Sequence, residues 1–298
     1  MRRLIPPLAA LLLLLAAGCA PPRTGTLGPA PAGPSPTTVT APTGSPTAPT
    51  PSASRTPTAP ATTGTPTTAA PTGPDGTLTV QLWFARTGKL VPTRRTLPAT
   101  VATSRLALTE LAAGPSAAET AAGLTTLVPA GTQVTRIAGG VATLLPPAGF
   151  DAGGAATARL RRAQVVWTLT QFPTVRRVAF APADTATGRD DYADLLPSIV
   201  VTAPAIGDRV GSPVAVTGTA DVYEATVSVR VLDAAGQEIG TAFTTASCGS
   251  GCRGGYRVEV RYRRPAAGPG TIEVYEVSAR DGSRINVVRI PVDMAASR

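Results

Sequence analysis

The segment of residues 20–76 limits the possible folds most, because about a fifth of the chain has no means of forming a core. Its 57 residues include 15 prolines and 16 threonines, and Leu27 and Val39 are its only larger aliphatic side chains. So little apolar surface cannot offset the entropy that a chain loses on ordering. We therefore expect residues 19–76 to form a disordered Pro/Thr-rich tether, partly polyproline II in character.

Residues 1–18 have the pattern of an export signal. Two arginines precede a ten-residue apolar run at residues 8–17, and small residues lead to Cys19. Ten residues are too few to span a bilayer as a helix, which needs about 20. The Leu15-Ala-Ala-Gly-Cys19 motif resembles the bacterial lipoprotein signal. This resemblance implies cleavage before Cys19, lipidation of its thiol and anchorage to the outer face of the cell membrane. The alternative is a plain secretory peptide with an incidental cysteine.

The remaining chain, from Thr77 onward, divides by charge into two regions. Residues 77–182 carry eleven basic and three acidic side chains, a net charge of +8, whereas residues 199–298 carry eleven and ten, a net charge of +1. The basic region favours anionic partners such as lipid headgroups, acidic wall polymers or an acidic protein face. The arginines can also reflect a high-GC genome, since Lys89 is the only lysine. Nucleic acid is not an expected partner, because no nucleic-acid-binding motif is present.

The periodicity of residues 77–182 predicts an α+β domain. Residues 78–84 alternate between apolar and more polar side chains, which indicates a strand with one buried face. Ser104 can cap a following helix, Glu119 is expected in a loop, and Gly139-Gly140 favours a tight hairpin turn. Further strands are predicted at residues 90–97, 133–138, 141–145 and 177–181, and helices at residues 104–113 and 156–171.

From residue 199 the pattern changes to strands only. Seven short strands with Gly, Pro and Asp turns favour an all-β immunoglobulin-like sandwich over residues 199–294. Residues 183–198 hold four aspartates and are predicted to be an acidic linker between the two domains. The seven strands are predicted at residues 199–203, 214–219, 225–232, 238–245, 256–262, 271–278 and 286–292.

Several motifs resemble domains of spore-germination and sporulation proteins of Gram-positive bacteria. In the first region, Leu111-Ala-Ala-Gly-Pro115 and Gln164-Val-Val-Trp-Thr-Leu-Thr-Gln-Phe-Pro173 resemble the GerMN domain. In the second region, Ile199-Val-Val-Thr-Ala-Pro204 and Tyr275-Glu-Val-Ser-Ala-Arg-Asp-Gly282 are similar to the immunoglobulin-like domain of bacterial spore germination proteins. The resemblance implies an envelope module for protein assembly, with no catalytic residues to carry over.

The side chains that most enzymes need are scarce. The chain contains no histidine, which removes the commonest general base and metal ligand. Residues 77–182 contain only Glu110, Glu119 and Asp151 as acids, a poor basis for a paired-carboxylate site. We therefore expect no enzymatic activity, no cofactor and no metal site.

Cys248 and Cys252 lie in a glycine-rich segment between two predicted strands. An exported compartment favours oxidation, so we expect a local disulfide between them. Metal binding is the alternative, although two thiols alone leave a tetrahedral zinc site half filled.

Arg159, Arg161 and Arg162 are candidate partner contacts. They crowd the first turns of the helix predicted at residues 156–171, where the helix dipole disfavours cations. They form either a basic docking patch or a merely solvated face.

Glu224 and Glu276 are also candidates, because each follows a tyrosine within a predicted strand. Neighbouring side chains in a strand face opposite ways, and an inward glutamate needs a partner such as Arg230 or Arg257. Each glutamate is either a structural hydrogen-bond acceptor or a contact to a ligand or partner.

These features together predict a membrane-anchored extracytoplasmic lipoprotein that acts as a non-enzymatic binding or assembly module. Its partner would be a protein or an anionic polymer of the cell envelope. One alternative is an accessory lipoprotein that modulates a membrane sensor kinase. Another is a cell-wall glycan-binding protein, which needs exposed aromatic side chains, and the chain has only two Trp, five Tyr and five Phe.

Overall fold

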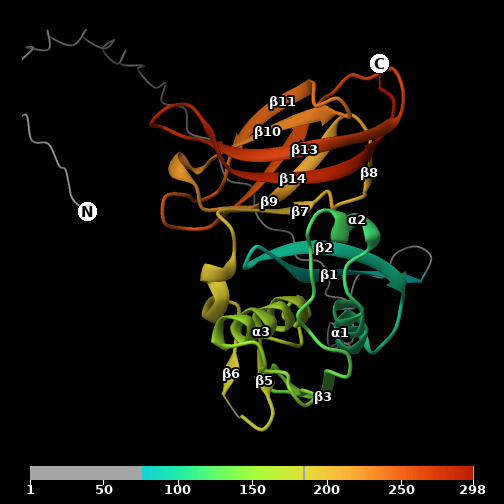
Figure 1. Ribbon diagram of the computed structural model, residues 1–298, viewed down its shortest axis with the longest axis vertical. Helices are drawn as coiled ribbons and strands as arrows, with labels where there is room; N and C mark the ends of the chain where they lie inside the picture. The colour runs from blue at the N-terminus through green and yellow to red at the C-terminus, as the bar shows by residue number, and fades with distance from the viewer. Residues whose placement is uncertain (1–75, 184, 298) are drawn as a thin grey trace, which may run out of the picture. The chain divides into compact units, whose positions relative to one another are not determined.

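The computed structural model describes residues 76–183 and 185–297, which are drawn in colour in Figure 1. The predicted signal, Cys19 and the tether, apart from Gly76, lie outside the described residues. All described residues belong to one compact unit, Thr65–Arg298. Within them, no helix is long and apolar enough to cross a membrane.

An α+β domain comes first. Strands β1 and β2 form a hairpin, and β3-β4-β5-β6 form a separate sheet in that order. Strands β4 and β5 run parallel and are connected through α3. Figure 1 shows α1 and α3 between the hairpin and this second sheet. The elements are β1 (Thr77–Arg86), β2 (Lys89–Pro98), α1 (Thr103–Ala113), α2 (Ala117–Ala121), β3 (Gln133–Ala138), β4 (Val141–Leu145), α3 (Ala155–Leu169), β5 (Arg177–Phe180), β6 (Ala186–Thr187) and the 3-10 helix η1 (Asp190–Leu195).

Strand β1 is more deeply buried than its alternation predicted. Val80, Leu82 and Phe84 are fully buried, as expected for the inner face. Trp83 was expected on the outer face but is also buried, because its ring packs on Trp167 of α3 with centroids 4.7 Å apart. The prediction of a single buried face is therefore wrong at the end of β1.

Polar side chains of α3 and its C-terminal end satisfy the free edge of β1, which has β2 as its only strand neighbour. The Gln81 N–H donates to Gln171 Oε1 at 2.7 Å, and the Trp83 N–H donates to Thr168 Oγ1 at 3.1 Å. Gln164 Nε2 donates to the Trp83 carbonyl at 3.1 Å. Buried backbone N–H and C=O groups without hydrogen-bond partners are energetically costly. These side chains therefore supply the hydrogen bonds that a further strand would otherwise make with the edge of β1. Gln164 itself is fully buried, and its hydrogen bonds compensate for the burial of its amide.

Two local predictions in this domain are wrong. Glu119 lies in the short helix α2 and not in a loop, because Ser116 and Glu119 form a reciprocal capping box at its start. Ser104 does not cap α1, which begins after Ala102 with no side-chain cap, and Ser104 itself is buried inside the helix.

Most of the predicted acidic linker is folded. β6 pairs with β5, and Tyr192 and Leu196 are buried in the core of the first domain. The number of aspartates suggested an exposed linker, but the apolar side chains between them in the sequence are buried and fold the segment onto the domain. Residues 186–196 are therefore part of the first domain.

The all-β sandwich follows, as predicted. A five-stranded sheet in the order β11-β10-β13-β14-β8 faces a three-stranded sheet, β12-β9-β7. Inward residues such as Val216, Val229 and Ile272 are fully buried between them. The short β8 was not predicted. The elements are β7 (Ile199–Ala203), β8 (Arg209–Val210), β9 (Val214–Ala220), the 3-10 helix η2 (Tyr223–Ala225), β10 (Thr226–Asp233), β11 (Glu238–Thr245), β12 (Gly254–Val260), β13 (Gly268–Val277) and β14 (Arg284–Met294).

Candidate functional site

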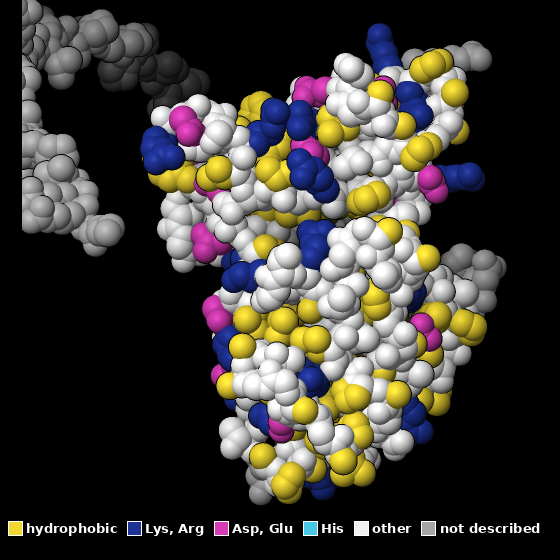
Figure 2. All heavy atoms as spheres, in the orientation of Figure 1, with side chains coloured by type: hydrophobic (Ala, Val, Ile, Leu, Met, Phe, Trp, Pro, Cys, Tyr) yellow, Lys and Arg dark blue, Asp and Glu magenta, His cyan; other side chains and the backbone are white. Residues whose placement is uncertain are grey.

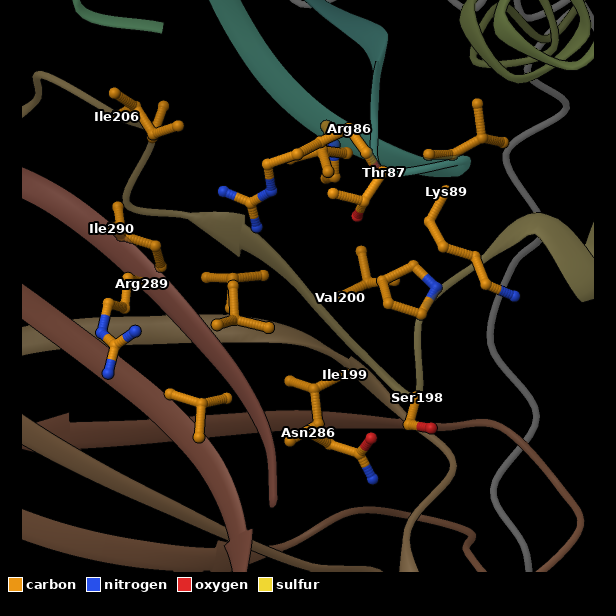
Figure 3. A pocket seen from close by; sticks show the side chains of 18 of the residues that line it. Arg86, Thr87, Lys89, Ser198, Ile199, Val200, Ile206, Asn286, Arg289 and Ile290 are labelled. Carbon is orange, nitrogen blue, oxygen red and sulfur yellow. The ribbon is translucent and has the colours of Figure 1, made fainter. Parts of the chain in front are cut away.

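A cavity of about 210 Å³ is lined by the end of the β1–β2 hairpin and by residues of β7 and β14 (Figure 3). Its walls are largely apolar and include Leu90, Val91, Val200, Ile206 and Ile290. A mostly apolar cavity with few polar groups is the usual form of a small-molecule site.

Arg86 is the polar side chain that distinguishes this cavity. It is the last residue of β1, and its methylene stem lies beside Gly123, where an added Cβ would be 3.8 Å from Arg86 Cδ. Figure 3 shows its guanidinium group pointing away from the hairpin, toward Ile206 and Ile290. No acceptor among the described residues bonds to this group, and burial lowers the pKa of Arg86. The cavity therefore contains a partly desolvated, uncompensated positive charge.

The other two cations that line the cavity already have partners. Lys89 Nζ donates to the Asp194 carbonyl at 2.7 Å, and Arg289 Nε donates to Glu273 Oε1 at 2.6 Å. Ser198 and Thr87 supply hydroxyls, but the residues that line the cavity include no His, Asp or Glu to act as a base, and the one lysine, Lys89, donates to a backbone carbonyl. The arrangement suits binding of an anion better than covalent chemistry.

Glu119 is the centre of a buried polar network that the loop prediction missed. Its side chain is 1% exposed and accepts hydrogen bonds from Thr93, from Arg95 and from the Ser116 N–H. Burial alone would raise the pKa of Glu119, but the bonds from Arg95, Thr93 and Ser116 lower it to about 2. The Ser-x-x-Glu spacing at residues 116–119 was the sequence signal for this helix start.

The three candidate arginines of α3 are separated by their partners. Arg159 pairs through two nitrogens with Asp194, and Arg162 pairs in the same way with Asp151. Arg161 is buried and donates to backbone carbonyls, including that of Leu127 at 2.7 Å. Arg161 is therefore neither part of a docking patch nor on a solvated face, because its guanidinium is hydrogen-bonded to the backbone of the loops that pack against α3. Figure 2 likewise shows basic side chains scattered over the visible face in small groups.

The two candidate glutamates lie in different environments. Glu276 is buried in β13, where it accepts from the Tyr223 N–H at 2.9 Å and from Asn286 Nδ2 at 2.7 Å. Glu224 is exposed and lies in the turn η2 with a φ of 52°, so its prediction in a strand is wrong. A left-handed turn before β10 was not detectable from the alternating pattern.

Neither Arg230 nor Arg257 contacts these two glutamates. Arg230 instead pairs with Glu273, a residue that the sequence reasoning missed and that is 2% exposed in β13. Burial opposes ionisation of this carboxyl, but Arg289 and Arg230 lower the pKa of Glu273. Arg257 lies near Glu259 on its own strand.

Cys248 and Cys252 are joined by a disulfide with Cα atoms 5.7 Å apart. The bridged loop contacts the η2 turn, because the Ser250 N–H donates to the Val222 carbonyl at 2.9 Å and the Glu224 N–H donates to Ser250 Oγ. Over residues 76–183 and 185–297, no cluster of three or more His, Cys, Asp or Glu side chains has the arrangement of a metal site.

Comparison with solved structures found weak likenesses. The first GerMN domain of the sporulation protein GerM from Bacillus subtilis is 24% identical, with a TM-score of 0.31, and the match covers 36% of this chain and 86% of that chain. The tandem GerMN domains of the same protein are 14% identical, with a TM-score of 0.34, and the match covers 74% of this chain and 62% of that one. CopC from Methylosinus trichosporium OB3b is 15% identical, with a TM-score of 0.23 over 34% of this chain and 96% of that chain. No curated protein matches the chain.

Family models match both folded domains. Residues 74–182 match the family described as sporulation and spore germination, and residues 198–283 match the immunoglobulin-like domain of bacterial spore germination. Both matches agree with the resemblance indicated by the sequence motifs. The described chain therefore consists of a sporulation and spore germination domain of the GerMN type followed by an immunoglobulin-like domain of the bacterial spore germination family.

Proposed function

We propose that the protein is a membrane-anchored extracytoplasmic lipoprotein whose two domains form a non-enzymatic binding and assembly module of the cell envelope. The observation that carries this proposal is the order of parts along the chain. A lipoprotein-like motif ending in Cys19 precedes a Pro/Thr-rich segment and then two domains of germination families. This order suits a protein in which an extended segment separates the binding domains from a lipid anchor.

The chemistry of the folded part supports a binding role. The whole chain lacks histidine, and Glu119 and Glu273, the most deeply buried acids of the described residues, are each paired with arginine. A carboxylate held in such a pair is poorly suited to proton transfer near neutral pH. The partner that we propose is a protein or an anionic polymer of the envelope.

Cys19→Ala tests the anchor. We expect the wild-type chain in the membrane fraction and the variant in the soluble or secreted fraction. Cys248→Ser with Cys252→Ser is the matched control, because it removes two cysteines and keeps Cys19; it should stay with the membrane. Retention of Cys19→Ala in the membrane fraction would contradict lipid anchoring.

Crosslinking in intact cells, followed by mass spectrometry, tests the assembly role. Recovery of a defined set of envelope proteins with the wild-type chain, and its loss with Cys19→Ala, is the expected result. Purified chain that is pulled down by isolated wall without any protein partner would contradict protein assembly.

Binding to wall glycan is a second candidate, and two exposed aromatic side chains of the sandwich favour it. Phe243 is 74% exposed and Tyr223 is 55% exposed. Aromatic rings offer large contact area, and stacked rings are a common element of binding surfaces. Under this candidate, Phe243→Ala should lower the amount of purified chain that sediments with isolated wall; unchanged sedimentation would exclude Phe243 from such a role.

A further inference from the structure

We propose that the Arg86 cavity binds a small organic monocarboxylate, with the carboxylate on the Arg86 guanidinium and a short apolar body against the hydrophobic walls. This inference goes beyond the proposed assembly role, since it adds a small-molecule site to the chain. Its starting point is the position of Arg86 among apolar side chains with no acid to balance its charge.

The positive charge of Arg86 indicates that the ligand of this cavity is an anion. A charged group that loses part of its water without gaining a partner is costly, so the partly desolvated guanidinium attracts an acceptor. Its planar arrangement of N–H donors matches the two oxygens of a carboxylate. The site itself supplies no acid: the residues that line the cavity include no Asp or Glu.

The other cations that line the cavity indicate that the ligand carries a single negative charge. Arg289 is already neutralised by Glu273, and Lys89 donates to a backbone carbonyl at the exposed side of the hairpin. Lys89 keeps its charge but is exposed to water, so Arg86 is the one partly buried cation of the lining without an acidic partner, and one carboxylate balances it. A phosphate group carrying two charges would leave one of them unbalanced next to Leu90 and Ile290.

The cavity volume limits the ligand's body. A dry protein cavity of about 150 Å³ can hold benzene, so the cavity of about 210 Å³ accepts roughly six to ten heavy atoms. Drug-sized molecules occupy larger pockets, of roughly 300 Å³ or more. Branched side chains such as Val91, Val200 and Ile206 form walls suited to an aliphatic or small aromatic group.

A segment of the same chain, or the surface of a folded partner protein, fits this cavity less well than a small molecule does. Within residues 20–76 the only acid is Asp75, directly before the start of the first domain, and the segment contains 15 prolines. A folded protein surface cannot enter so small a cavity, although the C-terminal carboxylate of a peptide can. Free acids and peptide ends share the same chemistry, and the probes below separate them.

Calorimetric titration of the purified full chain with sodium hexanoate tests the site. We expect saturable binding of one hexanoate per chain. Hexanamide, which lacks the charge, and acetate, which lacks the body, should each bind at least tenfold more weakly. N-acetylalaninate, which stays within the size limit of the cavity, imitates a peptide end: tighter binding than hexanoate would identify a chain terminus as the source of the carboxylate, and weaker binding a free acid. Equal affinity for hexanoate and hexanamide would overturn the proposal.

Arg86→Met separates binding from folding. It removes the uncompensated charge, so the melting temperature without ligand should stay the same or rise, whereas hexanoate affinity should fall at least tenfold. Arg136→Met, an exposed arginine of β3 that lines no part of this cavity, is the matched control and should bind hexanoate normally. Val288→Phe, which fills the cavity from a partly buried position, should also lower affinity. Normal hexanoate binding by both Arg86→Met and Val288→Phe would place the ligand elsewhere and refute the site.

Discussion

Replacing Glu119 by glutamine should destabilise the first domain strongly, because this side chain combines burial with three kinds of donor. Glu119 is 1% exposed and pairs with Arg95, which is 21% exposed. Glutamine keeps an acceptor oxygen but loses the charge that balances Arg95. It also weakens the capping box at the start of α2, where the Ser116 N–H donates to Glu119 Oε2 at 2.7 Å.

The size of the effect follows from the pKa of Glu119. Its ordinary value of 4.5 falls to about 2 in the folded protein. At about 1.4 kcal/mol per pKa unit, this difference contributes roughly 3 kcal/mol to the free energy of unfolding at neutral pH. Loss of one partner from a buried ion pair costs a similar amount, about 3–5 kcal/mol. We therefore expect Glu119→Gln to lower the free energy of unfolding by about 3 kcal/mol at pH 7.

The pH dependence has a definite sign. A depressed folded-state pKa stabilises the protein above the unfolded value, and this stabilisation is lost as the pH falls through the folded value. The difference between wild type and Glu119→Gln should thus be full above pH 4.5 and should shrink between pH 4.5 and about 2.

Urea unfolding followed by tryptophan fluorescence measures this effect in the right domain. The only two tryptophans, Trp83 and Trp167, both lie in the first domain. Asp190→Asn is the control: Asp190 is exposed in η1 with its side chain in no ion pair or hydrogen bond among the described residues, and its replacement should change the free energy by less than about 0.5 kcal/mol. A Glu119→Gln variant as stable as this control at pH 7, or a difference that persists unchanged toward pH 2, would refute the reasoning.

Three further substitutions test other parts of the fold. Gln164→Leu should lower the free energy of unfolding of the first domain by about 3 kcal/mol in the same fluorescence assay. The reason is that buried backbone groups, which Gln164 bonds at 2.8 to 3.3 Å, lose their hydrogen-bond partner. A loss below about 1 kcal/mol would show that these hydrogen bonds contribute little to the stability of the domain. Cys248→Ser with Cys252→Ser should cost about 2 kcal/mol from loop entropy, seen as a lower calorimetric melting temperature of the sandwich, and an unchanged temperature would argue against the bridge. Gly218→Ala should destabilise the sandwich by about 1–3 kcal/mol, because the new Cβ would lie 1.9 Å from the Val200 carbonyl oxygen; wild-type stability would show that β7 and β9 can separate freely.

Strand positions in the sandwich were predictable from the sequence because period-2 alternation directly reflects burial on one face. The strands β7 and β11 have the predicted bounds, Ile199–Ala203 and Glu238–Thr245. The Gly139-Gly140 hairpin was predictable for a different reason, since two successive positive φ angles, 59° and 83°, favour glycine at both positions. The two family resemblances rested on motifs within these same elements.

Polar partners were not predictable, because they are set by contacts between distant parts of the chain. Arg95 and Glu119 are 24 residues apart, and Arg161 bonds the Leu127 carbonyl from 34 residues away. Nothing in the spacing of α3 distinguished the buried Arg161 from its exposed neighbours. The cluster of aspartates at residues 183–198 likewise obscured the burial of Tyr192.

The sequence by itself determined the class of both domains, because local alternation, helix-length apolar stripes and turn residues act within a few positions of the chain. It also carries the motif at Cys19 on which the proposed anchor rests. Only the tertiary structure decided which charges are neutralised. Glu119 and Glu273 lie against arginines from neighbouring strands, whereas Arg86 lies in a mostly apolar cavity with no acid beside it. The energy of a charge depends on the water and partners around it, and those are defined only once the chain has folded.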